Sequence, residues 1–329
     1  RAKEYADFEE PNSRWKKVMA DVSWHSIKEQ PELPAIVANA NVDLVHIPYF
    51  SVPLFIKTPF VVTIHDLIIS HFPTGLASTK SKFTYWFKYV GYRLVLDQAI
   101  HNAQKIITVS QTVKKQICHD FQVPGAKIEV TYESGALEKN DVGVKPKLPQ
   151  HYLLYVGNAY PHKNLSRLIQ AFFELGKKNK GLQLVLIGRK DFFYERLQRQ
   201  VDNSGLSGRV VFPGSVANVE LVYWYKNAIA FVFPSLAEGF GIPGLEAMTV
   251  GCPVAASNLD VFKEIYGDAA LYFDPNDVSS IRDAIESLIT TKTVRQNLID
   301  LGHKQVKKYS WEKMAAETLK IYENVQFMV

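Results

Sequence analysis

Short apolar runs alternate with longer amphipathic segments along most of this chain. In the first half, four runs predict strands at 42–47, 60–64, 105–109 and 127–131. In the second half, six runs predict strands at 152–156, 182–187, 210–212, 228–233, 253–256 and 269–273. Segments with helical spacing separate them. Strands that alternate with helices predict parallel sheets covered on both faces, which is an α/β architecture.

One segment interrupts the alternation and divides the chain. Residues 137–149 show no periodicity and are rich in Lys, Asp, Gly and Pro, which is typical of an interdomain linker. A length of 329 residues also indicates about two domains. We therefore predict two doubly wound, Rossmann-like domains that face each other, at 1–148 and 149–310, followed by a last helix at 311–329.

Composition narrows the class of protein. With 47% hydrophobic residues the chain can form substantial cores, and a net charge of +5 permits anionic ligands without indicating a nucleic-acid binder. Two distant cysteines, Cys118 and Cys252, favour a reducing cytoplasm. We find no signal peptide and no apolar run of about 18 residues. The chain starts at Arg1 without a strand and Gly-rich loop, so we expect that an N-terminal segment is missing.

The stretch 234–253 carries the strongest signal for a ligand. After an apolar strand comes a loop with Glu238, and a helix then continues through Glu246 to about Val250. Glycines in the loop let backbone amides approach a ligand, and the helix N-terminus favours anionic oxygens. This pattern suits a ligand with hydroxyl and phosphate groups. The simpler alternative is an ordinary strand–loop–helix connection with an acid near the helix start.

Two further loops carry candidate binding residues. Lys163 ends the loop that starts at Gly157, and Asn164 is a plausible N-cap of the following helix. A lysine beside a helix N-terminus suits a diphosphate, although a solvated loop lysine is the alternative. Arg189 and Lys190 follow the next strand and could add positive charge, and a surface arginine is the alternative for Arg189.

The first half offers polar residues at the carboxyl ends of its strands. His65, Asp66, Ser110 and Glu133 occupy such positions, where ligands of open α/β sheets bind. His65 could contact a sugar through its side chain or its backbone carbonyl. A lone histidine is also commonly a structural residue with satisfied hydrogen bonds.

The sequence Glu-Gly-Phe-Gly-Ile-Pro-Gly-Leu-Glu-Ala-Met at 238–248 resembles the Glu-x7-Glu signature of retaining glycosyltransferases of family 4, which have the two-domain GT-B fold. The resemblance implies that Lys163 holds the donor diphosphate, Glu246 the ribose, and Glu238 and His65 the transferred sugar. It also implies that the last helix packs back on the first domain. The donor-binding set that we expect is Gly157, Asn158, Arg189, Lys190, Gly239, Phe240, Gly241, Ile242 and Glu246, with His65, Lys163 and Glu238 as catalytic residues.

The chain departs from this family at two places. Asn158 and His162 stand where arginines are usual, and 131–136 reads Thr-Tyr-Glu-Ser-Gly-Ala where Pro-Asn-Gly-Val is usual. A well-placed donor to the leaving group is worth about 3–4 kcal/mol. Either Arg189 or Lys190 supplies the positive charge that the missing arginine would give, or catalysis is weaker than in the family. An inactive donor-binding partner subunit is therefore the alternative function.

The expected reaction is transfer of a hexose from a nucleotide-diphosphate sugar to a glycan or lipid-linked acceptor. Retention suggests front-face attack, and the motif variants resemble mannosyl- and rhamnosyltransferases, with GDP-mannose as the first donor. We expect no metal and no cofactor, because no Asp-x-Asp follows a strand and no His/Cys cluster has ligand spacing. A phosphorylase of the same fold would need pyridoxal phosphate. A nicotinamide dehydrogenase is disfavoured because no strand precedes Gly-x-Gly-x-x-Gly.

One predicted helix also suggests a surface role. Residues 80–93 interleave basic and aromatic side chains, a pattern that can lie on an anionic membrane. Peripheral contact with the inner face of a membrane would suit a lipid-linked acceptor. The alternative is a helix that packs on the core and exposes a solvated basic face.

Overall fold

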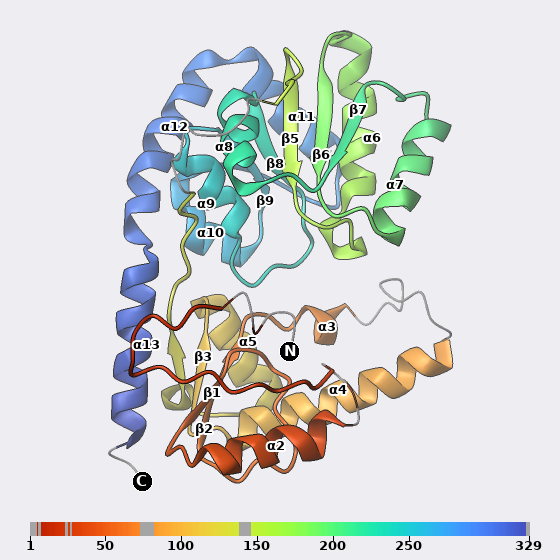
Figure 1. Cartoon of the computed structure of the whole chain (residues 1–329). Helices are drawn as coiled ribbons and strands as arrows, with labels where there is room; N and C mark the ends of the chain where they lie inside the picture. The colour runs from red at the N-terminus through yellow and green to blue at the C-terminus, as the bar shows by residue number, and fades with distance from the viewer. Residues whose placement is uncertain are drawn as a thin grey trace.

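The computed structural model describes residues 5, 8–23, 26, 28–72, 82–137 and 146–326, which contain two parallel β-sheets. The first sheet has the order β1-β2-β3-β4, formed by Val45–Ile47, Phe60–Ile64, Lys105–Thr108 and Ile128–Val130. The second has the order β10-β9-β8-β5-β6-β7. Its strands are β5 (Tyr152–Val156), β6 (Gln183–Ile187), β7 (Val210–Gly214), β8 (Ala230–Phe233), β9 (Val254–Ser257) and β10 (Ala270–Phe273). Figure 1 shows the two sheets in separate domains, one above the other.

Helices connect and cover the strands. In the first domain they are α2 (Glu29–Ala40), α3 (Ile68–His71), α4 (Lys82–Asn102) and α5 (Gln111–Phe121). In the second they are α6 (Leu165–Lys178), α7 (Phe192–Asn203), α8 (Asn218–Asn227), α9 (Ile242–Thr249), α10 (Asp260–Tyr266), α11 (Val278–Thr290) and α12 (Lys292–Gln305). The predicted α/β class is confirmed, because parallel strands buried on both faces need such helical crossovers.

The core explains why the apolar runs became strands. All five residues of β2 are buried, and so are all four residues of β8. A run of four or five consecutive apolar residues fits a strand covered on both faces. The sequence did not predict two short helices, α3 and α10, which are too short to show a clear period.

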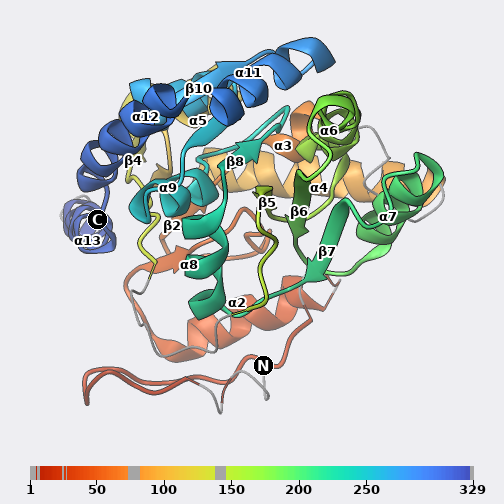
Figure 2. The same cartoon turned by 90° about the horizontal axis from the view of Figure 1, so that it is seen from above.

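The last helix, α13 (Trp311–Gln326), leaves the second domain and runs along the first (Figure 1). Its Ile321 and Val325 are buried in one apolar cluster with Val61 of β2 and Ile107 of β3. Seen from above, α13 stands at one edge of the molecule and α7 at the opposite edge (Figure 2). Residues 327–329 of the predicted helix and 138–145 of the predicted linker lie outside the described residues, and the division at 148 and 149 stays a prediction.

Direct hydrogen bonds join the two domains at the start of α5. Ser110 is the N-cap of α5: its Oγ accepts from Val113 N and donates to the carbonyl of Gly239 at 2.8 Å. The Glu264 carboxylate of α10 accepts from Gln111 N at 2.6 Å and from Thr112 N at 2.8 Å. The carboxyl ends of strands in the first sheet are therefore held close to the loop that precedes α9.

Candidate active site

The loop between β8 and α9 touches the first domain through a glycine. A Cβ atom at Gly239 would lie 2.0 Å from the backbone oxygen of His65, so a side chain there would force the loop away. Gly241 has a φ of 115°, a conformation that favours glycine, and its carbonyl accepts from Tyr266 Oη at 2.6 Å. Phe240, between them, is buried. The glycines thus let this backbone form one wall between the domains.

Lys163 and Glu238 form a tight ion pair on this wall. Lys163 Nζ lies 2.5 Å from Glu238 Oε1, and the two side chains are 13% and 10% exposed. Lys163 ends a turn of 3-10 helix, Pro161–Lys163, after β5, whereas Glu238 belongs to the loop after β8. Adjacent strands β5 and β8 therefore bring together two predicted site residues that are 75 positions apart.

Asn164 occupies the predicted N-cap position of α6, but in an unusual way. It has a left-handed conformation with a φ of 59°, and its side chain makes no capping hydrogen bond. Instead Nδ2 donates to the carbonyls of Pro234 at 3.0 Å and Pro275 at 2.7 Å. Asn164 therefore ties the Lys163 loop to the loop that carries Glu238, which helps to fix the ion pair.

Glu246 lies on α9 and faces α8. Its Oε2 accepts a hydrogen bond from Tyr225 Oη at 2.9 Å. Burial raises the pKa of Glu246, and the Tyr225 hydrogen bond opposes this shift. Ile242, the first residue of α9, is half-buried. The half-buried carboxylate of Glu246 is thus held in place by its hydrogen bond with Tyr225.

The other predicted residues follow β5 and β6. Gly157 has a φ of 149°. Its carbonyl oxygen lies against Gly188, since a Cβ atom added to Gly188 would be 2.0 Å from that oxygen. Asn158 is half-buried, and its backbone oxygen accepts from Tyr155 Oη at 2.7 Å. Arg189 and Lys190 are exposed, and within the described chain neither forms an ion pair with another predicted site residue.

His65 faces the second domain from the end of β2. Its backbone contacts Gly239, and its Nε2 lies 3.8 Å from Glu133 Oε1. Burial lowers the pKa of His65, against the opposite effect of Asp66. Glu133 was predicted at a strand end but not as a site residue. Its place after β4 was the only signal, and that signal does not show which side chains it meets.

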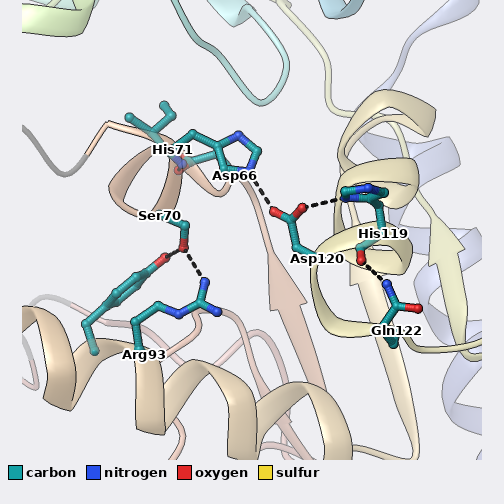
Figure 3. A network of polar contacts seen from close by, with 9 residues as sticks. Asp66, Ser70, His71, Arg93, His119, Asp120 and Gln122 are labelled. Atoms are coloured by element: carbon teal, nitrogen blue, oxygen red, sulfur yellow. Dashed lines mark hydrogen bonds and ion pairs between the residues drawn. The ribbon is translucent and has the colours of Figure 1, made fainter.

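A cavity of about 210 Å³ opens between the domains beside Glu238. Its polar lining includes His71 of α3, Gln116 of α5 and Asp260 of α10. Figure 3 shows His71 pointing toward Asp120, with 2.6 Å between Nε2 and Oδ2, while Asp120 Oδ1 lies 3.0 Å from His119 Nδ1. These histidines hold the pKa of Asp120 below its ordinary value against the effect of burial. No sequence pattern indicated this lining, because it depends on the short helices α3 and α10.

The part of the chain that the structure describes holds neither a metal-binding cluster nor a membrane-spanning helix. Within those residues no group of three or more His, Cys, Asp and Glu side chains is placed to hold a metal ion. Among the helices of the same residues, none has the length and apolar character needed to cross a bilayer.

Comparison with known proteins assigns the chain. Residues 138–305 match the family described as Glycosyl transferases group 1, and residues 8–133 match Glycosyltransferase Family 4. This chain belongs to the group 1 glycosyltransferases. The resemblance stated from Glu238 to Met248 is thereby confirmed, and the protein is a glycosyltransferase.

Two similar relatives carry mannosyltransferase names. The O-antigen chain mannosyltransferase RfbU of Salmonella typhimurium is 31% identical over 271 residues, which cover 80% of this chain and 70% of that protein. O-antigen chain mannosyltransferase B of Escherichia coli is 31% identical over 288 residues, which cover 84% and 73%.

Solved structures support the fold. Sucrose-phosphate synthase from Thermosynechococcus elongatus superimposes with a TM-score of 0.75 at 19% identity, covering 92% of this chain and 79% of that one. Anabaena HepE, solved with UDP and glucose, gives a TM-score of 0.71 at 17% identity, covering 94% and 85%. With the two facing parallel sheets, these similarities confirm the predicted GT-B fold.

Proposed function

We propose that this glycosyltransferase is a retaining mannosyltransferase of polysaccharide assembly, which uses GDP-mannose and a glycan or lipid-linked acceptor. The observation that carries the proposal is the Lys163–Glu238 pair beside the start of α9, opposite His65. This pair places a cation that can bind a diphosphate beside a carboxylate that can accept hydrogen bonds from sugar hydroxyls. The mannosyltransferase names of two relatives favour mannose over other hexoses.

The donor would lie mainly on the second domain. Lys163 and the N-terminus of α9 would hold the diphosphate, with Arg189 or Lys190 adding positive charge from the end of β6. Glu246 would accept hydrogen bonds from the ribose hydroxyls. A phosphate oxygen would replace Glu238 at Lys163 Nζ, and the released carboxylate would then bind the transferred sugar.

The reaction needs stabilisation of the leaving phosphate. An acceptor oxygen attacks the anomeric carbon on the face from which GDP departs, the bond to phosphate breaks, and a phosphate oxygen takes the acceptor proton. Lys163 stabilises the negative charge that develops on the phosphate. We expect this step to need neither a metal ion nor a cofactor. The cavity beside Glu238 would admit the acceptor.

Calorimetric titration with GDP, UDP, dTDP and ADP, in buffer without metal, tests the donor site. We expect GDP to bind selectively and Glu246→Ala to weaken its binding about tenfold or more, because buried hydrogen bonds to a carboxylate are worth about 1.5–3 kcal/mol. Glu195→Ala, an exposed change on α7, is the control and should bind like the wild type.

Turnover separates the enzyme from an inactive partner subunit. Release of GDP from GDP-mannose in the presence of acceptor would support the enzyme. GDP binding without any turnover would favour the partner subunit, which the Asn158 departure motivates. Failure of all four diphosphates to bind would contradict both functions.

A further inference from the structure

Glu133 is a mostly buried carboxylate that the mechanism above does not use. It follows β4, its side chain is 13% exposed, and it belongs to none of the apolar clusters. Its Oε1 lies 3.8 Å from Nε2 of His65, and within the described residues no hydrogen bond to its carboxylate is found. The carboxylate oxygens of Glu133 are not among the fully buried polar atoms that lack a partner in the described residues, so a ligand hydroxyl can reach them and form a hydrogen bond.

Its two neighbours place Glu133 opposite the Glu238–Glu246 stretch. His65, whose Nε2 lies near Glu133 Oε1, touches Gly239 through its backbone oxygen. Gly135, two residues after Glu133, lies against Glu246, since a Cβ on Gly135 would be 2.6 Å from Glu246 N. The residues on either side of Glu133 therefore contact the Glu238–Glu246 stretch from the first domain, at Gly239 and at Glu246.

The electrostatic environment of Glu133 suits a hydrogen bond to a sugar hydroxyl. Burial and, to a smaller extent, Asp66 raise the pKa of Glu133 to about 7. Burial also lowers the pKa of His65 and favours its neutral form, against the opposite effect of Asp66. A carboxylate accepts hydrogen bonds from sugar hydroxyls, and its protonated form can donate one. Either form suits a hexose better than a phosphate.

We propose that Glu133 binds a hydroxyl group of the transferred hexose from the first-domain side, opposite Glu238. This inference rests on the proposed function and adds a determinant of sugar binding to it. Glu133 forms a hydrogen bond only and takes no part in proton transfer.

Paired calorimetric titrations at pH 8 with GDP and GDP-mannose test the inference. We expect Glu133→Ala to lose about tenfold in affinity for GDP-mannose, or 1.4 kcal/mol, and to keep GDP affinity within about twofold. Glu133→Gln should lose less, because its amide retains a hydrogen-bonding oxygen. Glu129→Gln is the matched control, since Glu129 lies on β4 just before Glu133 with a side chain 46% exposed, and should change neither affinity.

The remaining outcomes contradict the inference in distinguishable ways. Unchanged affinity for both ligands in Glu133→Ala would show that Glu133 does not touch the sugar. Equal losses for both ligands, in Glu133→Gln as well, would show a purely structural role. If the wild type and Glu129→Gln bind no GDP, the proposed donor itself is wrong, and this inference fails with it.

Discussion

At the residue scale, a buried acid in the wall between the domains affects stability as well as binding. The pKa of Glu133 is about 7 in the folded protein, above its ordinary value of 4.5. The folded state therefore binds a proton that the unfolded state releases between pH 4.5 and 7. By linkage, this group lowers stability as pH rises through that window.

Glu133→Gln, which stays neutral, should therefore gain stability relative to the wild type as pH rises. We expect the difference in unfolding free energy to grow in favour of the variant by roughly 3 kcal/mol between pH 4 and pH 8, since one pKa unit is worth about 1.4 kcal/mol. Urea denaturation at both pH values measures it. A difference that stays constant with pH would show that Glu133 titrates normally.

At the element scale, α4 combines a buried end with an exposed aromatic start. Leu96 and Ile100 are buried in the core of the first domain, whereas Trp86 is 58% and Phe87 55% exposed beside exposed Lys88. Lys80, part of the predicted basic pattern, lies outside the described residues. The second half of α4 therefore packs on the core, as one of the two interpretations expects. Contact of the exposed half with an anionic membrane surface stays a prediction.

Phosphatidylglycerol vesicles test this role of α4. We expect the wild type to co-sediment with them, salt to weaken binding, and Lys82→Glu with Lys88→Glu to abolish it, because basic residues near an anionic surface contribute about 1 kcal/mol each. Lys177→Glu with Lys180→Glu, an equal charge change on the second domain, should bind like the wild type. Equal binding by the α4 double variant would exclude the membrane role.

At the scale of the whole molecule, one side chain links the domains through a helix end. The Glu264 carboxylate of α10 accepts from two backbone amides at the start of α5, and also from Thr112 Oγ1 at 2.6 Å and Tyr132 Oη at 3.1 Å. An acid at a helix N-terminus also interacts favourably with the helix dipole. This contact holds the facing sheet ends together.

Glu264→Ala should loosen the domain pair. We expect a loss of about 2–4 kcal/mol in unfolding free energy, since several hydrogen bonds to a charged group disappear together. Guanidinium denaturation measures it, and small-angle scattering should show a larger radius of gyration. Glu286→Ala, which removes a surface ion pair with Lys178, should cost less than about 1 kcal/mol. Equal losses in the two variants would argue against a special role for Glu264.

The sequence by itself determined most strands and the most specific loop. Strands β2 and β5 have the predicted bounds, because local apolar runs specify them. The Glu238–Glu246 stretch was also recognisable, since its glycines and acids are adjacent along the chain.

Only the tertiary structure decided which distant groups meet. The Lys163–Glu238 pair, the Glu133–His65 contact and the hydrogen bonds of Asn164 all join residues from different strand ends. Glu264 of α10 likewise caps helix α5, whose Thr112 lies 152 positions away in the chain. No local pattern encodes such contacts, because they depend on strand order, on short helices such as α10 and on how closely the two domains approach.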